Sequence, residues 1–140
     1  MFKKILVAFD GSKQAEKALK CALDYARKAK ASVSIIYVAE RIPLPISPTN
    51  STYIVQQELK AVGELEMKKA GHIARKAGVK ARLEVVEGHP VDEIIKYAKN
   101  GGFDLIVVGN RGMSGVERLL LGSVSDSVIH HAHCAVLVVK

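Results

Sequence analysis

The sequence lacks tryptophan, has few aromatic residues and contains no long apolar run. Aromatic residues make up 5% of its 140 residues, so no platform for stacking nucleic-acid bases is evident. No apolar run approaches the roughly 18 residues that a membrane-spanning helix needs. The N-terminus also lacks the long apolar region and the small-residue cleavage site of a signal peptide. These absences predict a cytoplasmic protein that does not span a membrane.

Cysteine and proline are scarce as well. Cys21 and Cys134 form no ligand-like spacing, and a disulfide is not expected in a reducing compartment. Cys21 lies among the alanines of an expected helix face, which predicts a small core residue. Three of the four prolines fall in Glu40–Thr52. This segment is predicted to be a long loop, either a plain connector or a flap beside a ligand site.

The charge balance is basic, with a formal net charge of +7 at pH 7. Such an excess is compatible with an acidic partner such as nucleic acid. Here, however, the lysines are spread along expected helices and are interleaved with aspartate and glutamate. We therefore expect no nucleic-acid partner, and we infer only a general attraction for anions, nucleotides included.

Apolar runs suited to buried strands alternate with amphipathic segments along the whole chain. Solid apolar runs are typical of parallel strands covered on both faces, whereas clean alternation, as in Val79–Val85, is typical of an edge strand. The predicted strands are Ile5–Phe9, Ser32–Ala39, Val79–Val85, Phe103–Val108 and Ala135–Val139. The first predicted helix begins after Ser12. The other three are predicted at Tyr53–Ala77, Pro90–Asn100 and Gly122–Ala132. This pattern predicts one α/β domain of residues 1–140 with a parallel sheet.

Each predicted helix has an apolar face, and three of them have recognisable ends. Ser12 is expected to cap the first helix, Gly78 to follow the second and Pro90 to occupy the first turn of the third. The apolar faces are predicted at Ala15, Ala18, Leu19, Ala22, Leu23 and Ala26 in the first helix, at Val55, Leu59, Val62, Ala70, Ile73, Ala74 and Ala77 in the second, at Val91, Ile94, Ile95 and Ala98 in the third, and at Val124, Val128 and Ile129 in the last.

The motif with the clearest chemical content is Gly109-Asn110-Arg111-Gly112, which directly follows the fourth predicted strand. Nine residues, Met113–Leu121, separate it from Gly122-Ser123 at the start of the last helix. Glycines let the backbone turn tightly and approach a ligand, and the first turn of a helix offers free N–H groups to an anion. This order of parts predicts a phosphate cradle of backbone amides. The alternative is a set of ordinary turn glycines.

The spacing Gly109-x2-Gly112-x9-Gly122-Ser123 resembles the ATP-binding signature of the universal stress protein family. The resemblance covers essentially the whole chain, from Lys3 to Lys140. It implies a three-layer α/β/α, Rossmann-like fold of the adenine nucleotide α-hydrolase type, with a five-stranded parallel sheet in the order 3-2-1-4-5. In that order the first and fourth strands are adjacent at a switch point, where open α/β sheets bind ligands.

The motif supplies most of the candidate nucleotide-binding residues. The amides of Asn110, Arg111 and Gly112 are expected to wrap the phosphates after Gly109, and Arg111 either pairs with them or lies in solvent. The last helix is expected to hold the phosphate end through its first residues, which are Gly122, Ser123, Val124 and Ser125. Alternatively, Ser123 is a simple N-cap and Ser125 an exposed first-turn serine.

Two candidate residues lie outside the motif. Asp10 follows the first strand, and an ionised carboxylate suits a ribose hydroxyl or a magnesium ion, although an Asp before a glycine is often a turn residue. The resemblance implies that Asp10 lies near the nucleoside and that the backbone of Val38 contacts the adenine ring. The cluster His130–Cys134 has metal-like spacing, but it falls at a helix end without further ligands, so no metal site is expected.

The favoured function is an ATP-binding regulatory protein with slow or absent hydrolysis. The sequence contains neither a Walker motif nor an evident general base, and phosphoryl transfer needs more than positioning. One alternative is a dimeric scaffold that uses no nucleotide; another is an adenine-nucleotide enzyme, for which the short Asp10-Gly11-Ser12 turn is a poor match. The apolar terminal strand Ala135–Val139 predicts a homodimer formed by antiparallel pairing of two such strands, as the resemblance also implies.

Overall fold

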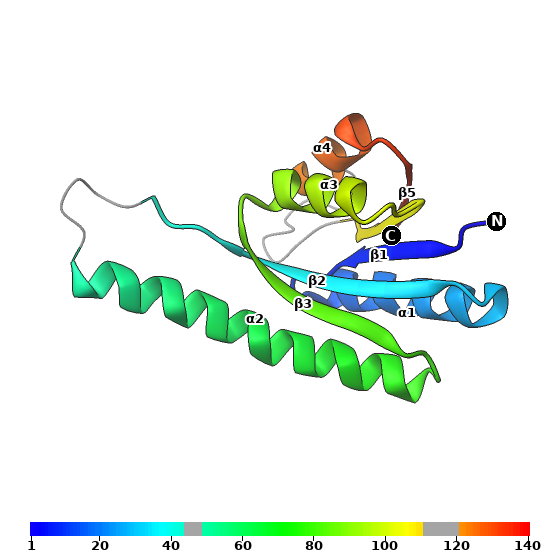
Figure 1. The fold of residues 1–140 in the computed structure, drawn as a ribbon, viewed down its shortest axis with the longest axis horizontal. Helices are drawn as coiled ribbons and strands as arrows, with labels where there is room; N and C mark the ends of the chain where they lie inside the picture. The colour runs from blue at the N-terminus through cyan, green and yellow to red at the C-terminus, as the bar shows by residue number, and fades with distance from the viewer. Residues whose placement is uncertain (44–48, 111–120) are drawn as a thin grey trace.

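The structure of the protein, a computed structural model, describes residues 1–43, 49–110 and 121–140. Its centre is a single sheet in which neighbouring strands run parallel, in the order β3-β2-β1-β4-β5 (Figure 1). The strands are β1 (Lys4–Ala8), β2 (Ser32–Glu40), β3 (Ala81–Gly88), β4 (Leu105–Gly109) and β5 (Ala135–Val139). The predicted α/β class and strand order are confirmed.

Helices cover both faces of this sheet. They are α1 (Lys13–Ala29), α2 (Asn50–Lys76), α3 (Pro90–Asn100) and α4 (Ser123–His131). Figure 1 shows α1 and α2 below the sheet and α3 and α4 above it. Each face has its own core: Ile5 and Val7 of β1 are fully buried with α1 and α2, whereas Leu6 is fully buried with α3 and α4. This alternation follows from the two-residue repeat of a strand.

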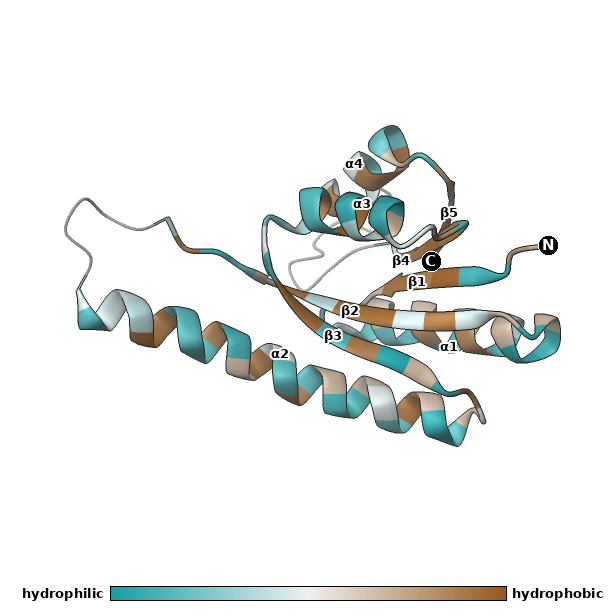
Figure 2. Cartoon of the chain, viewed as in Figure 1, coloured by the Kyte–Doolittle hydropathy of each residue, from teal (hydrophilic) through white to brown (hydrophobic). Residues whose placement is uncertain are grey.

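Burial falls from the centre of the sheet to its edges. Residues 105–108 of β4 are all buried, and so is most of β1, as the brown colour of the central strands in Figure 2 reflects. Both edge strands, β3 and β5, are only partly covered. The edge position predicted for Val79–Val85 is confirmed, although β3 begins at Ala81 and continues to Gly88. A central parallel strand must be apolar on both faces because helices cover both.

The predicted helix ends are largely confirmed. The Ser12 hydroxyl accepts a hydrogen bond from the Ala15 N–H at 3.0 Å, and Pro90 occupies the first turn of α3. Gly78 follows Ala77, the C-cap of α2, and has φ of +75°, a left-handed conformation that glycine adopts without a steric penalty. These local signals are reliable because each one satisfies, or in the case of proline removes, a backbone group that a helix end leaves open.

The predicted apolar face of α2 is partly wrong. Val55 and Val62 are 43% and 47% exposed, whereas the buried residues of α2 are Gly63, Met67, Ala70, Gly71 and Ala74. A Cβ built on Gly63 would lie 2.7 Å from the Tyr37 ring. Because the glycines and alanines among these residues let the helix approach the strands closely, they set the face that turns inward, and the valines lie elsewhere on the helix.

Three further packing predictions are wrong. Val124 and Ile129 of α4 are 37% and 42% exposed, while Val128 is fully buried. The helix is only nine residues long, so it presents a narrow inward stripe. Cys21 is exposed on α1, because the buried stripe of alanines and leucines beside it already fills the interface. None of the helices in the described ranges is long and apolar enough to cross a membrane.

Candidate functional site

Two candidate residues, Asp10 and Gly109, lie at the carboxyl ends of β1 and β4, which are neighbouring strands inside the sheet. The two strands are hydrogen-bonded neighbours, with Val7 opposite Val107. Asp10 lies just beyond the carboxyl end of β1, and Gly109 is the last residue of β4. Because parallel strands end at the same edge, both residues face the switch point at which the strand order reverses.

Asp10 forms a tight turn with the residues after it. Its Oδ1 accepts a hydrogen bond from the Ser12 N–H at 2.9 Å, and Gly11 has φ of +85°. This is an Asx turn, so the structural role expected of an Asp before glycine is confirmed. The turn engages one carboxylate oxygen, and the second can still serve a hydroxyl or a cation.

A carboxylate that the sequence did not single out lies beside this turn. A Cβ built on Gly11 would lie 2.6 Å from Cδ of Glu66 on α2. Oε2 of Glu66 is buried and has no hydrogen-bond partner among the described residues. Burial raises the pKa of the nearby Tyr37, and the negative charges of Glu66, Asp10 and Glu40 raise it further. In the sequence, Glu66 is one of many helix charges; only packing brings it to the strand ends.

Gly109 is required by packing. A Cβ at this position would lie 2.9 Å from the carbonyl carbon of Gln14 and 3.1 Å from the Ala15 nitrogen. Both are backbone atoms in the first turn of α1 and cannot move aside as a side chain would. The absence of a Cβ therefore lets the end of β4 rest against α1, whether or not a ligand is bound.

The main-chain amides of Asn110 and Gly122 are used within the fold. The Asn110 N–H donates to the carbonyl of Val139, and its own carbonyl accepts from the Gly122 N–H, both at 2.8 Å. Asn110 is 9% exposed. These bonds join β4, β5 and the start of α4. Arg111 and Gly112, the other residues of the motif, lie outside the described residues.

The first turn of α4 has backbone N–H groups that no carbonyl of the helix accepts from. Its first intrahelical bond runs from the Asp126 N–H to the Gly122 carbonyl, so the amides of Ser123, Val124 and Ser125 have no acceptor within the helix. Gly122 is the N-cap, without a side-chain cap. The interpretation of Ser123 as the N-cap is therefore wrong.

Ser125 connects α4 to the end of β4. Its hydroxyl donates a hydrogen bond to the Gly109 carbonyl at 2.5 Å, and the residue is 5% exposed. The alternative of an exposed first-turn serine is therefore wrong. Ser123 and Val124 are exposed at the same helix end. The hydrogen bond holds the free amides of α4 next to the last residue of β4.

The remaining candidate segments lie farther along the strands and helices. Val38 pairs with Val86 near the end of β2 and packs partly buried against the α3–α4 side of the core. In the histidine cluster, Nδ1 of His130 and of His131 lie 2.8 Å from the carbonyls of Asp126 and Ser127. Within the described ranges no three potential metal ligands come together. Of the segment Glu40–Thr52, residues 44–48 lie outside the described residues.

Comparison with known proteins identifies the family. The sequence profile of the Universal stress protein family matches residues 1–140. This chain belongs to the universal stress protein family. It is 40% identical to Universal stress protein MJ0531 of Methanocaldococcus jannaschii, covering 100% of this chain and 83% of that protein. It is 38% identical to Universal stress protein YxiE of Bacillus subtilis, covering 100% of both chains.

Solved structures of the family share this fold. Universal stress protein UspA from Lactobacillus plantarum superposes with a TM-score of 0.84 at 28% identity, covering 99% of this chain and 98% of that one. A universal stress protein in complex with cAMP gives a TM-score of 0.77 at 27% identity over 99% and 97% of the two chains. One from Archaeoglobus fulgidus in complex with dAMP gives 0.68 at 25% identity over 99% and 98%.

Proposed function

We propose that this universal stress protein is a single-domain cytoplasmic regulatory protein that binds an adenine nucleotide, ATP foremost, and hydrolyses it slowly or not at all. The observation that carries the proposal is the start of α4, where three amides without helical acceptors lie next to the Gly109 carbonyl through the Ser125 bond. Such a helix start is suited to a phosphate. The complexes of structural relatives with cAMP and dAMP support an adenine nucleotide as the ligand class.

Each candidate residue has a role in this proposal. Ser123, Val124 and Ser125 receive the phosphates, and the amides of Arg111 and Gly112 are further donors. Asp10 binds a ribose hydroxyl or a magnesium ion that accompanies the nucleotide; carboxylate oxygen is a ligand type that Mg²⁺ prefers. The backbone of Val38 borders the adenine.

The remaining binding residues contribute through the backbone geometry that they fix. The Gly109, Asn110 and Gly122 main chains hold the two halves of the cradle together through the bonds described above. The buried Ser125 holds α4 to the end of β4, and Gly109, which has no room for a Cβ, fixes the separation between β4 and α1. Pre-organised donors of this kind bind an anion without a large ordering cost.

A first experiment examines the purified chain for bound nucleotide. The protein is denatured, small molecules are extracted and identified by mass, and ATP is titrated into the wild type and Gly122→Val with and without magnesium. Valine at the N-cap blocks the approach of a phosphate, so we expect an affinity loss of about tenfold or more, equivalent to about 1.4 kcal/mol. Ile129→Ala, an exposed position later on α4, serves as the matched control and retains binding.

The same titrations test the alternatives. ADP, AMP and cAMP as competitors rank the nucleotides, and phosphate release measures turnover. Absence of extracted nucleotide, together with absence of binding in the presence of magnesium, would contradict the proposal and leave a nucleotide-free scaffold. Rapid turnover or transfer of the adenylate to a second substrate would instead indicate an enzyme.

The scaffold alternative rests on one observation of its own. β5 is an edge strand with apolar residues, and its Leu137 is 40% exposed. Exposed apolar edges invite pairing with another chain. A homodimer through antiparallel pairing of two β5 strands is therefore part of the proposal, and it is compatible with nucleotide binding at the other positions.

A further inference from the structure

The outer face of α2 carries apolar residues that the fold does not bury. Ile54 and Leu65 are 56% and 65% exposed, and Val55 and Val62 beside them are 43% and 47% exposed. The same helix packs its opposite face, centred on Gly63 and Ala70, against the sheet. Figure 2 shows apolar segments interspersed among polar ones along the whole helix. Clustered exposed apolar side chains in a soluble domain indicate an interaction surface.

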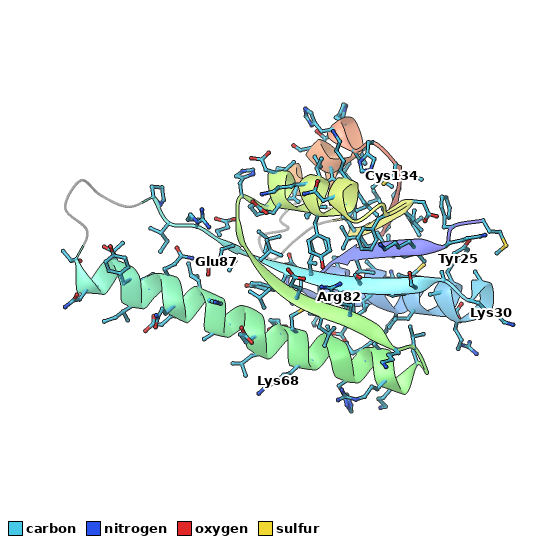
Figure 3. All side chains as sticks on the ribbon, viewed as in Figure 1. Tyr25, Lys30, Lys68, Arg82, Glu87 and Cys134 are labelled. Atoms are coloured by element: carbon cyan, nitrogen blue, oxygen red, sulfur yellow. The ribbon has the colours of Figure 1, made fainter. Side chains whose placement is uncertain are left out.

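The outer face follows a coiled-coil repeat. Residues at alternating intervals of four and three share one side of a helix and form a seam. On α2 the seam residues are all exposed, and they are Ile54, Glu58, Ala61, Leu65, Lys68 and His72. Figure 3 shows the Lys68 side chain pointing away from the sheet. The seam therefore faces solvent and is available to a second helix.

The seam is complementary to itself when two copies run antiparallel. With a two-fold axis at Gly63, Ile54 faces His72 of the second copy, and Ala61 faces its Leu65. Glu58 faces Lys68 of the second copy, and the symmetry repeats each contact. The small Ala61 thus meets the large Leu65 on either side of the axis, and both charges meet opposite charges. A parallel pair would instead place Glu58 against Glu58 and Lys68 against Lys68.

From this placement we infer that α2 is an interface between two copies of this chain, paired antiparallel about an axis at Gly63 through the seam residues. An unrelated partner would have no need of charges placed symmetrically about the helix centre, so the pattern favours a second copy over other occupants. In isologous interfaces the same patch faces itself, which requires this reciprocal complementarity. Glu58, Lys68 and His72 are polar, and polar seam positions fix register while reducing affinity.

The interface is separate from the nucleotide site and from β5. α2 packs on β2 and β3, and β3 is the edge strand at the other end of the strand order from β5. Both two-fold contacts fit on one chain without overlap, and together they build a tetramer or a longer assembly. The inference does not depend on nucleotide binding or on the β5 dimer.

Charge exchange on the full chain tests the inference. Mass in solution is measured by light scattering over a range of protein concentrations for wild type, Glu58→Lys, Lys68→Glu and the double variant. Each single variant places like charges opposite each other twice, so we expect the dissociation constant of one assembly step to rise about tenfold or more. The double variant restores opposite charges and regains the wild-type mass. Lys96→Glu, an exposed position on α3, is the matched control and leaves the mass unchanged.

A comparison of the single variants with the wild type distinguishes antiparallel from parallel pairing, because a parallel wild-type pair already has like charges at both contacts and a single variant would not weaken it. Glu58→Lys and Lys68→Glu chains each repel themselves, but mixed together they present opposite charges at both contacts and regain association. Leu65→Glu, which buries a charge at the centre of the seam, abolishes the step. The inference is overturned if the wild type lacks this assembly step, if Leu65→Glu and both single variants assemble like the wild type, or if neither the double variant nor the mixture recovers.

Discussion

The hydroxyl of Ser125 donates a hydrogen bond to the main-chain carbonyl of Gly109 across 2.5 Å. These two residues lie on opposite sides of the glycine-rich motif, one at the end of β4 and one in the first turn of α4. Because Ser125 is buried, this bond belongs to the fold itself. It positions the first-turn amides of α4. It therefore links the stability of the carboxyl end of β4 to the geometry of the proposed phosphate cradle.

Two serines in the same helix turn should have different roles. Ser125→Ala removes the donor to Gly109, and we expect a loss of about 1 kcal/mol in the free energy of unfolding. Ser123→Ala changes an exposed residue, and we expect its unfolding free energy to stay within about 0.5 kcal/mol of wild type. If its hydroxyl binds phosphate, Ser123→Ala weakens nucleotide binding nonetheless. Urea unfolding and nucleotide titration of both variants check this; equal stabilities would contradict it.

The same glycine-to-alanine change should have opposite effects at two positions. Gly109→Ala forces a Cβ to within 2.9 Å of the α1 backbone at Gln14, and we expect a loss of about 1–3 kcal/mol from overpacking. At Gly71 the new Cβ meets Leu83 Cδ1 at 2.8 Å, and Leu83 is a flexible side chain that is 38% exposed. Alanine also favours a helix by up to about 1 kcal/mol over glycine. Gly71→Ala should therefore be neutral or stabilising in urea or thermal unfolding.

Acid stability should depend on Asp104. The main-chain N–H groups of Lys3 and Lys4 donate to its carboxylate at 2.9 and 3.1 Å. These hydrogen bonds, the one from Lys3 first, hold the pKa of Asp104 below its usual value. A carboxylate with a lowered folded-state pKa stabilises the fold above its unfolded pKa of about 3.9, and the contribution disappears as pH falls through the lower, folded value.

Asp104→Asn tests this dependence because the amide oxygen can still accept a hydrogen bond but does not titrate. We expect the wild type to lose more stability than Asp104→Asn when the pH is lowered from about 6 to about 3. Urea midpoints measured across this range give the comparison. Parallel losses in the two proteins would assign the acid sensitivity to other groups.

The proposed β5 dimer should depend on outward-facing main-chain groups. The Val139 carbonyl accepts from Asn110, the residue after β4, so by alternation along the strand the N–H of Val136 points away from β4. Val136→Pro removes a donor at the free edge without removing one from the sheet. We expect the β5-mediated assembly step to disappear in light scattering, while circular dichroism still reports a folded chain. Leu137→Lys, which adds a charge at an exposed edge position, should have the same effect.

Much of the fold could be predicted from the sequence because its signals are local. A solid apolar run such as residues 105–108 predicts a central strand. Ser12 and Gly78 help to satisfy backbone groups that any helix end leaves open, and Pro90 removes one such group. Helix faces were predicted well where one stripe is clearly apolar, as in α1. They were predicted poorly in α2 and α4, because apolar residues there lie on more than one side and only packing selects the buried one.

The glycine-rich motif could be recognised from the sequence, because a glycine pair after a strand and a Gly-Ser pair before a helix have a recognisable spacing. Only the tertiary structure decided what these residues contact. Gly109 rests against the backbone of α1, Ser125 reaches back to Gly109, and Glu66 comes from a distant helix to lie beside Gly11. Hydrophobic periodicity and helix capping act between residues a few positions apart. The contacts of Gly109, Ser125 and Glu66 join residues far apart in the chain. They depend on how the helices pack onto the sheet, and the hydrophobic period alone does not determine the order of its strands.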